Sequence, residues 1–320
     1  MTLKGYLSFV EIQTKIASLI PFLFGTLYSI YRYGKVDLAN LIFMFISMIC
    51  FDMVTTAINN YCDYENEIKH SNGKYFGKNP MFIHKISKKK GIITIYTLLF
   101  ISIIFGIILT VRTSLLVLFL GVICFFIGIF YTFGPIPISR MPLGEVFSGL
   151  FMGFLITFLT IYINIFDLGY FSISILNGEF IAKINIFETI SIFLVSIPLI
   201  TGIANIMLSN NICDLEDDKK VSRFTLPYYI GKDLAIKLYK ILYYFGYFAI
   251  LISIILKILP TTSIIVFFTI PIVSKNIKEF ENKQIKSETF VLAVKNFVII
   301  NFAYILALIG NFVIFNILDI

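Results

Sequence analysis

Long runs of apolar residues, separated by shorter polar and charged stretches, follow one another from end to end of the chain. Most runs approach the roughly 20 residues that a helix needs to cross the apolar core of a bilayer. We count nine runs, at about residues 11–31, 39–59, 91–111, 114–133, 143–165, 186–208, 235–257, 260–274 and 294–316. The pattern predicts an all-α integral membrane protein with a single transmembrane domain over residues 1–320.

Composition supports this class. The chain is 58% hydrophobic and only 14% charged, with a mean hydropathy of +0.91, which is far from the composition of soluble proteins. It contains 35 Phe and 18 Tyr but no Trp, so Tyr and the basic residues must serve as interfacial anchors. The four cysteines are too few and too scattered for a disulfide framework or a zinc site.

Two polar stretches at the ends of predicted spans carry nearly the same sequence. Residues 59–67 read NNYCDYENE and residues 210–218 read NNICDLEDD, so five of the nine positions are identical. Both keep the pattern Asn-x-x-x-Asp-x-x-x-acid, whose members lie on one face of a helix of about 3.6 residues per turn. We call these faces the first acidic stripe (Asn59, Asp63 and Glu67) and the second acidic stripe (Asn210, Asp214 and Asp218).

Oxygen ligands gathered in this way favour a divalent cation. Nearby carboxylates repel one another unless a cation lies between them, and Mg²⁺ prefers carboxylates together with the oxygens of a substrate phosphate. We therefore expect all six residues to hold Mg²⁺ and, through it, a diphosphate, with Asp63 and Asp214 as the central catalytic ligands. Each stripe alone could be the solvated end of a helix, but two matching copies beside apolar spans argue against that interpretation.

Basic residues follow each stripe, where a bound diphosphate needs them. A diphosphate carries more negative charge than one Mg²⁺ offsets, so further cations must reach over the acidic site. The candidates for diphosphate binding are Lys74, Lys78, Lys219 and Arg223. Lysines 88–90 are better explained as positive residues beside anionic lipid.

Two ionisable residues lie inside predicted spans, where a charge is costly and a functional role is the default hypothesis. Glu145 enters the span at 143–165 after a tight turn, and Lys15 lies about one turn into the first span. We expect both to bind the acceptor substrate. Alternatively, Lys15 extends its ammonium group to the membrane interface, and Glu145 closes a hydrogen-bond network at the helix end.

The distribution of basic residues predicts the orientation. With the N-terminus in the cytoplasm, 18 of the 26 basic residues fall on the cytoplasmic side and five on the other side. This positive-inside bias places the acidic stripes and the long charged loops in the cytoplasm and the C-terminus on the opposite side of the cell membrane. Topology therefore explains the net charge of +7, and no motif indicates a nucleic-acid partner or an obligate protein partner.

The combination of motifs resembles one family. The two stripes, the turn at residues 134–145 (GPIPISRMPLGE) and the segment Thr225-Leu226-Pro227 are similar to those of the UbiA superfamily of intramembrane aromatic prenyltransferases, and most like its MenA branch, the 1,4-dihydroxy-2-naphthoate polyprenyltransferases. The resemblance implies a nine-helix bundle with a central cavity, to which the charged loops add a cytoplasmic cap. The chain departs from the common pattern at three positions, namely Asn60, Glu67 and Phe224.

The resemblance also implies an activity. We expect Mg²⁺-dependent transfer of a polyprenyl group from polyprenyl diphosphate to an aromatic acid within the lipid bilayer, with 1,4-dihydroxy-2-naphthoate as the acceptor and demethylmenaquinone as the product. One alternative is another acceptor, such as 4-hydroxybenzoate. Another is a cation-coupled membrane transporter, although transport predicts acids at mid-membrane depth and here the acids cluster at one face.

Overall fold

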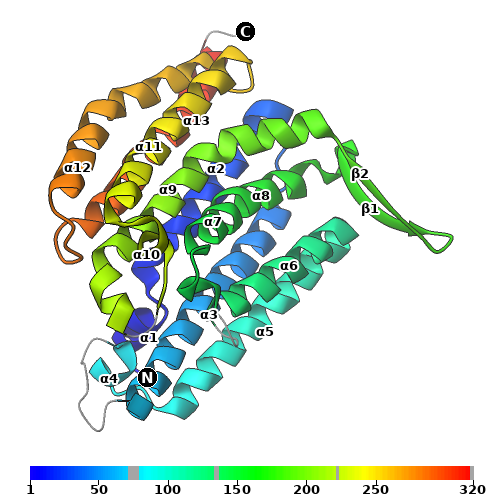
Figure 1. The fold of residues 1–320 in the computed structure, drawn as a ribbon. Helices are drawn as coiled ribbons and strands as arrows, with labels where there is room; N and C mark the ends of the chain where they lie inside the picture. The colour runs from blue at the N-terminus through cyan, green and yellow to red at the C-terminus, as the bar shows by residue number, and fades with distance from the viewer. Residues whose placement is uncertain (71–78, 133–136, 221–222, 318–320) are drawn as a thin grey trace. The chain divides into compact units, whose positions relative to one another are not determined.

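The computed structural model describes residues 1–70, 79–132, 137–220 and 223–317 (Figure 1). The chain divides into two compact units, each formed from two segments. Unit 1 comprises Met1–Ser18 and Leu38–Pro137, and unit 2 comprises Leu19–Asp37 and Ile138–Ile320. The first acidic stripe belongs to unit 1 and the second to unit 2, so each stripe is described within its own unit.

Unit 1 is built around the long helix α3 (Leu38–His70), which packs along α5 (Lys88–Arg112). The remaining elements of this unit are α1 (Leu3–Phe9), the 3₁₀ helix η1 (Ile12–Lys15), α4 (Pro80–Ile83) and α6 (Leu115–Thr132). Ser47 and Ser102 each donate a hydrogen bond to the backbone carbonyl of the other, at 2.9 and 2.7 Å. Small hydroxyl residues of this kind let two membrane helices approach closely and satisfy each other's polar groups.

A compact apolar cluster closes the end of unit 1 where the first acidic stripe begins. It joins residues from α1, α3, α4, α5 and the adjoining loops, namely Phe9, Val10, Val54, Ala57, Met81, Ile86 and Leu98. Asn79 caps α4 by accepting a hydrogen bond from the backbone N–H of Met81 at 2.8 Å. The short helix α4 is thereby held against the apolar face of α3, directly beside the polar residues of the stripe.

Unit 2 contains most of the long helices. α2 (Ile16–Tyr33) runs into it from unit 1, and the long helix α9 (Ile186–Lys220) packs against α11 (Lys232–Ile255) and α13 (Phe290–Ile317). The shorter elements are η2 (Ile138–Arg140), α7 (Gly144–Ser148), η3 (Gly149–Leu155), α8 (Ile156–Ile165), η4 (Phe166–Leu168), α10 (Leu226–Ile230), η5 (Thr261–Thr269) and α12 (Ile270–Asn282).

A π-helical stretch, η3, makes the closest helix contact in the span that runs from α7 to α8. A Cβ atom added to Gly153 would lie 2.6 Å from the backbone of Ile200 in α9, and one on Gly149 would lie 2.8 Å from the carbonyl oxygen of Ile200. Glycines four residues apart allow this approach because they present no side chain to the neighbouring helix. The contact holds α7, and with it Glu145, against α9.

Within the described residues, one segment departs from the expected all-α chain. Strands β1 (Phe171–Leu176) and β2 (Glu179–Ile184) form an antiparallel hairpin between α8 and α9. Figure 1 shows the hairpin extending beyond the adjacent ends of these two helices. It lies at the opposite end of α9 from the second acidic stripe.

The predicted count of nine spans is not confirmed. Six described helices are long and apolar enough to cross a membrane, and a seventh span is added if the bent pair Leu3–Phe9 and Ile12–Tyr33 counts as one. The apolar helix Leu115–Tyr131 falls short of that length. The run at 260–274 is divided between η5 and the start of α12, where Pro271 occupies the first turn of the new helix. The central cavity and the cytoplasmic cap remain predictions.

Candidate functional site

The first acidic stripe lies on the last turns of α3. Asn59 Nδ2 donates to Asp63 Oδ2 at 3.5 Å, which confirms that these two residues are neighbours on one helical face. Asp63 is exposed, whereas Glu67 is partly buried. Glu67 Oε2 has no hydrogen-bond partner among the described residues, although it is buried. A buried carboxylate oxygen without a partner is costly, and a bound cation would relieve that cost.

Asn60 does not extend the stripe. Its side chain is 5% exposed, and its Nδ2 atom donates to the backbone oxygen of Phe9 at 3.0 Å and to Glu11 Oε1 at 3.1 Å. The backbone oxygen of Asn60 accepts a hydrogen bond from Asn79 Nδ2 at 2.8 Å. Glu11 has a left-handed backbone with φ of 48°, at the break between α1 and η1. Asn60 therefore ties this break and the start of α4 to the helix that carries the stripe.

Lys15 is buried in unit 1 and fully engaged there. Its side chain is 1% exposed, and its Nζ atom contacts Asp52 Oδ1 at 2.7 Å, the backbone oxygen of Asp52 at 3.0 Å and Thr56 Oγ1 at 2.6 Å. Ser18 Oγ donates to the other carboxylate oxygen of Asp52 at 2.6 Å. The ammonium group is held by these acceptors inside unit 1. An acceptor carboxylate would have to compete with Asp52 for it.

The second acidic stripe lies on the last turns of α9, beside Arg223. Arg223 Nη1 lies 3.6 Å from Asp218 Oδ1, and the Arg223 backbone N–H donates to the Asp218 carbonyl at 2.9 Å. The guanidinium Nε also donates to the carbonyl of Ser139 at 3.2 Å. Asp218 is buried, and its Oδ2 atom has no hydrogen-bond partner in the described part of the chain. Arg223 thus lies beside Asp218, and its binding of a diphosphate stays a prediction.

Glu145 enters the same end of unit 2 from α7. Asn211 Nδ2 donates to Glu145 Oε1 at 2.8 Å, and both side chains are buried. Glu145 Oε2 and Asn211 Oδ1 lack hydrogen-bond partners among the residues that the structure describes. These two oxygens are acceptors that a ligand hydroxyl could satisfy.

Besides the acidic stripes, the internal repeat provides a structural hydrogen bond in each copy. In both copies the second asparagine of the Asn-Asn pair is buried and donates to a glutamate from another element, Asn60 to Glu11 and Asn211 to Glu145. The identity of these two asparagines in the repeat was a sequence signal, but their glutamate partners lie 49 and 66 residues away along the chain. Only the folded structure shows which glutamate each asparagine binds.

Three lysines near the second stripe form ion pairs, and one of them, Lys220, pairs with Asp217 on its own helix. Lys286, from the segment between α12 and α13, pairs with Asp214, the central acid of the stripe. Lys219 pairs with Glu216 on its own helix at 2.8 Å, and both are exposed. Lys286 was not among the predicted site residues, because only the fold brings its loop to α9. Lys74 and Lys78 lie outside the described residues.

The donor set fits a divalent cation. No three His, Cys, Asp or Glu side chains gather into one metal-binding group within either described unit. Each stripe nevertheless has a carboxylate oxygen that is buried and unpaired among the described residues, on Glu67 and on Asp218. Oxygen atoms of carboxylates and amides are the ligands that Mg²⁺ prefers. Each stripe offers such oxygens within its own unit, and the role of these residues as metal ligands stays a prediction.

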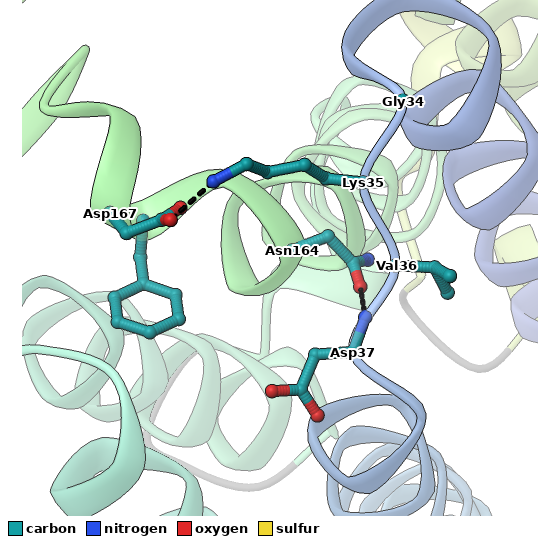
Figure 2. A pocket seen from close by; sticks show the side chains of 7 residues that line it. Gly34, Lys35, Val36, Asp37, Asn164 and Asp167 are labelled. Carbon is teal, nitrogen blue, oxygen red and sulfur yellow. Dashed lines mark hydrogen bonds and ion pairs between the residues drawn. The ribbon is translucent and has the colours of Figure 1, made fainter.

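A surface pocket in unit 2 lies apart from these residues. Figure 2 shows it between the segment after α2 and the end of α8, where Lys35 pairs with Asp167. The backbone N–H of Asp37 donates to Asn164 Oδ1 at 2.7 Å across the same pocket. It contains none of the predicted site residues, and its polar groups bind one another.

Comparison with known proteins gives one family. The sequence profile of the UbiA prenyltransferase family matches residues 18–294. The chain is 27% identical over 280 residues to 1,4-dihydroxy-2-naphthoate octaprenyltransferase of Bacillus subtilis (strain 168), covering 87% of this chain and 83% of the relative. These matches span both units and both acidic stripes.

Solved structures share the fold. A UbiA homolog from Aeropyrum pernix K1 has a TM-score of 0.66 at 18% identity, covering 92% of this chain and 98% of that one. A UbiA homolog from Archaeoglobus fulgidus bound to GPP and Mg²⁺ has a TM-score of 0.54 at 16% identity, covering 96% and 98%. At these identities the likeness concerns the fold alone.

Proposed function

Because the chain belongs to the UbiA prenyltransferase family, we propose that it transfers a polyprenyl group from polyprenyl diphosphate to an aromatic acid, with Mg²⁺ as cofactor. The observation that carries this proposal is the repeated acidic stripe, with one buried, unpaired carboxylate oxygen in each copy among the described residues. The solved relative bound to GPP and Mg²⁺ supports the same pair of ligands.

The acidic stripes form the diphosphate end of the proposed site. Asp63 and Asp214 act as the central metal ligands, and the outer ligands are Asn59, Glu67, Asn210 and Asp218. Bound Mg²⁺ supplies positive charge that offsets the charge of the departing diphosphate. Arg223 can donate charge-assisted hydrogen bonds to the same phosphate oxygens, because its guanidinium already lies beside Asp218. Lys74, Lys78 and Lys219 complete the proposed set of cations.

The reaction at the other end of the donor is a substitution at an allylic carbon. The C–O bond to the diphosphate breaks with both electrons leaving on oxygen, and a new C–C bond forms to an electron-rich ring carbon. Apolar helix faces must keep water from the electron-poor carbon, since water would capture it in place of the ring. For a ring carbon that carries a carboxylate, CO₂ leaves and the aromatic ring is restored.

The acceptor is proposed to be 1,4-dihydroxy-2-naphthoate, giving demethylmenaquinone in its reduced form. The name of the Bacillus subtilis relative supports this choice. Glu145 Oε2 and Asn211 Oδ1 are the proposed acceptors for a ring hydroxyl, because both are buried and unpaired in the described part of the chain. Lys15 is the proposed partner of the carboxylate, in competition with Asp52.

The test is mass spectrometry of the prenylated product. Membranes containing the protein are incubated with Mg²⁺, mixed polyprenyl diphosphates, and equal amounts of 1,4-dihydroxy-2-naphthoate and 4-hydroxybenzoate. We expect a product of 1,4-dihydroxy-2-naphthoate that has gained the prenyl group and lost CO₂, that is absent with EDTA, and that is absent from membranes without the protein. A prenylated product that keeps the benzoate carboxylate would show that 4-hydroxybenzoate is the acceptor. The absence of any prenylated product would refute the activity.

A further inference from the structure

The β-hairpin between α8 and α9 has no part in the proposed chemistry. Its strands pair in a single register from Phe171↔Ile184 to Leu176↔Glu179. The two residues between the strands, Asn177 and Gly178, both have positive φ, 51° and 83°. A two-residue Asn-Gly connection of this kind matches the twist of the strands and fixes their register. The register in turn decides which side chains share a face.

That register places every polar residue of the two strands on the same face. Paired residues lie on the same face of a hairpin, and successive pairs alternate between faces. One face carries only apolar residues, namely the pairs Phe171↔Ile184 and Ile173↔Ala182, and Phe180 nearer the turn. The other face carries the pairs Ser172↔Lys183, Ser174↔Ile181 and Leu176↔Glu179. We call the second face the polar face, although Ile181 and Leu176 lie on it near the turn, so the contrast between the two faces is clearest at the base of the hairpin.

The base of the hairpin is fixed to unit 2. Phe171 is buried, and its ring packs edge-on against Phe158 and Tyr162 of α8, at centroid distances of 5.1 and 6.2 Å. The Asn185 backbone N–H donates to the Tyr170 carbonyl at 2.9 Å. Near the turn the apolar face is uncovered within the described chain, since Phe180 is 62% exposed. At the base, Ile184 pairs with the buried Phe171 but is itself 64% exposed.

The position of the hairpin identifies what covers that face. α8 ends the span Gly144–Leu168 and α9 begins the span Ile186–Lys220, so the hairpin joins two membrane helices at the same boundary of the bilayer. Its apolar face continues at Ile184 into the first turn of α9, where Ile186 and Phe187 are exposed as well. Exposed apolar residues on a membrane span face lipid, so the hairpin adds to a surface that already lies in the bilayer.

We propose that this hairpin is an interfacial lipid anchor. Phe180 and Ile184 lie among the lipid acyl chains near the headgroups, while Ser172, Ser174 and Lys183 face water and phosphate groups. A sheet edge and its side chains can lie in this zone because headgroups and water are available to the backbone, unlike in the bilayer core. The anchor holds the ends of α8 and α9 at the membrane boundary, at the far end of α9 from the acidic stripe that this helix carries.

The absence of Trp from the chain allows a direct test. Phe180→Trp places a single fluorophore on the apolar face, and Ser174→Trp places one on the polar face at nearly the same distance from the turn. Both proteins are reconstituted in phosphatidylcholine vesicles, with and without phosphatidylcholine brominated in the acyl chains. Ile184→Trp is a second apolar-face reporter should Phe180→Trp not fold, and all variants are checked for a monodisperse peak in size-exclusion chromatography.

We expect brominated lipid to quench the Phe180→Trp protein at least about twofold more than the Ser174→Trp protein, with emission at shorter wavelength. Acrylamide in the water should show the reverse order. Equal quenching of the two proteins by both agents would overturn the proposal. So would blue emission that brominated lipid leaves unchanged and that is lost on diluting the protein in lipid, because a second copy of the chain would then cover the face. Neither readout depends on prenyl transfer.

Discussion

Replacing Lys15 with methionine tests what this buried ammonium group does. Three acceptors surround its Nζ atom, two from Asp52 and one from Thr56, at 2.6–3.0 Å, and the side chain is 1% exposed. Methionine keeps most of the volume but removes the cation from the Asp52 carboxylate, which is 14% exposed and still accepts a hydrogen bond from the Ser18 hydroxyl. Breaking a buried ion pair from one side costs about 3–5 kcal/mol.

Removing both charges shows how much of the stability lost in Lys15→Met comes from the unpaired Asp52 carboxylate. In Lys15→Met/Asp52→Leu no charge is left unpaired, and replacing a buried pair by apolar residues is often close to neutral. We expect the double variant to recover most of the stability that Lys15→Met loses. The free energy of unfolding is measured by titrating SDS into mixed micelles and following helix content by circular dichroism. A loss below about 0.5 kcal/mol in Lys15→Met, or a double variant as unstable as the single, would refute this reasoning.

The same pair of variants separates packing from acceptor binding. If Lys15 also holds the acceptor carboxylate, the KM for the aromatic acid stays raised in the double variant after stability has returned. The ratio of its KM to that of wild type then corresponds to about 1.5–3 kcal/mol of lost binding free energy. If Lys15 serves only Asp52, the acceptor KM returns to the wild-type value together with stability. The KM for the prenyl diphosphate serves as the internal reference in both cases.

Three further changes follow from contacts in the two units. Asn60→Asp should lower the midpoint of thermal unfolding, because it loses the donor to Phe9 and sets a carboxylate beside Glu11; adding Glu11→Gln, which supplies a donor, should restore part of the loss. Arg223→Met should raise the KM for prenyl diphosphate about tenfold or more, and the enzyme should still require Mg²⁺. The control is Lys220→Met, which removes an exposed cation paired with Asp217 and should change that KM little. Lys286→Met should lower the Mg²⁺ concentration that gives half-maximal rate, because the ammonium no longer competes for Asp214; an unchanged Mg²⁺ dependence would contradict that.

Local patterns in the sequence were enough to predict a helical membrane protein and the shared face of Asn59 and Asp63, but not the number of spans. The spacing of Asn59 and Asp63 makes them neighbours on any helix, and the short distance along the chain from Asp218 to Arg223 brings that cation back over the end of α9. The hairpin also had a local signal, since residues 171–184 alternate around Asn177-Gly178, but the pattern of apolar spans on either side predicted a loop there and no strand.

Contacts between distant segments could not be predicted in this way. Lys15 was recognised as unusual, but its partner Asp52 is 37 residues away, and nothing in the spacing distinguishes Asp52 from other acids. The same holds for Lys286 and Asp214, which are 72 residues apart. Asn60 was noted as a departure from the family pattern, and the structure gives a physical reason for an amide there, because a carboxylate could not donate to Phe9 and Glu11.

Joint use of the two acidic stripes is the central claim, and one set of rate measurements tests it most directly. Diphosphate release is followed at saturating substrates over a Mg²⁺ titration for wild type, Asp63→Asn, Asp214→Asn and Asp217→Asn, the last being an exposed acid of α9 that lies outside the stripe. We expect each stripe variant to lose at least about a hundredfold in rate without loss of folded protein, and Asp217→Asn to stay within about threefold of wild type. Wild-type rates for either stripe variant at high Mg²⁺, or equal losses in all three variants, would contradict the account.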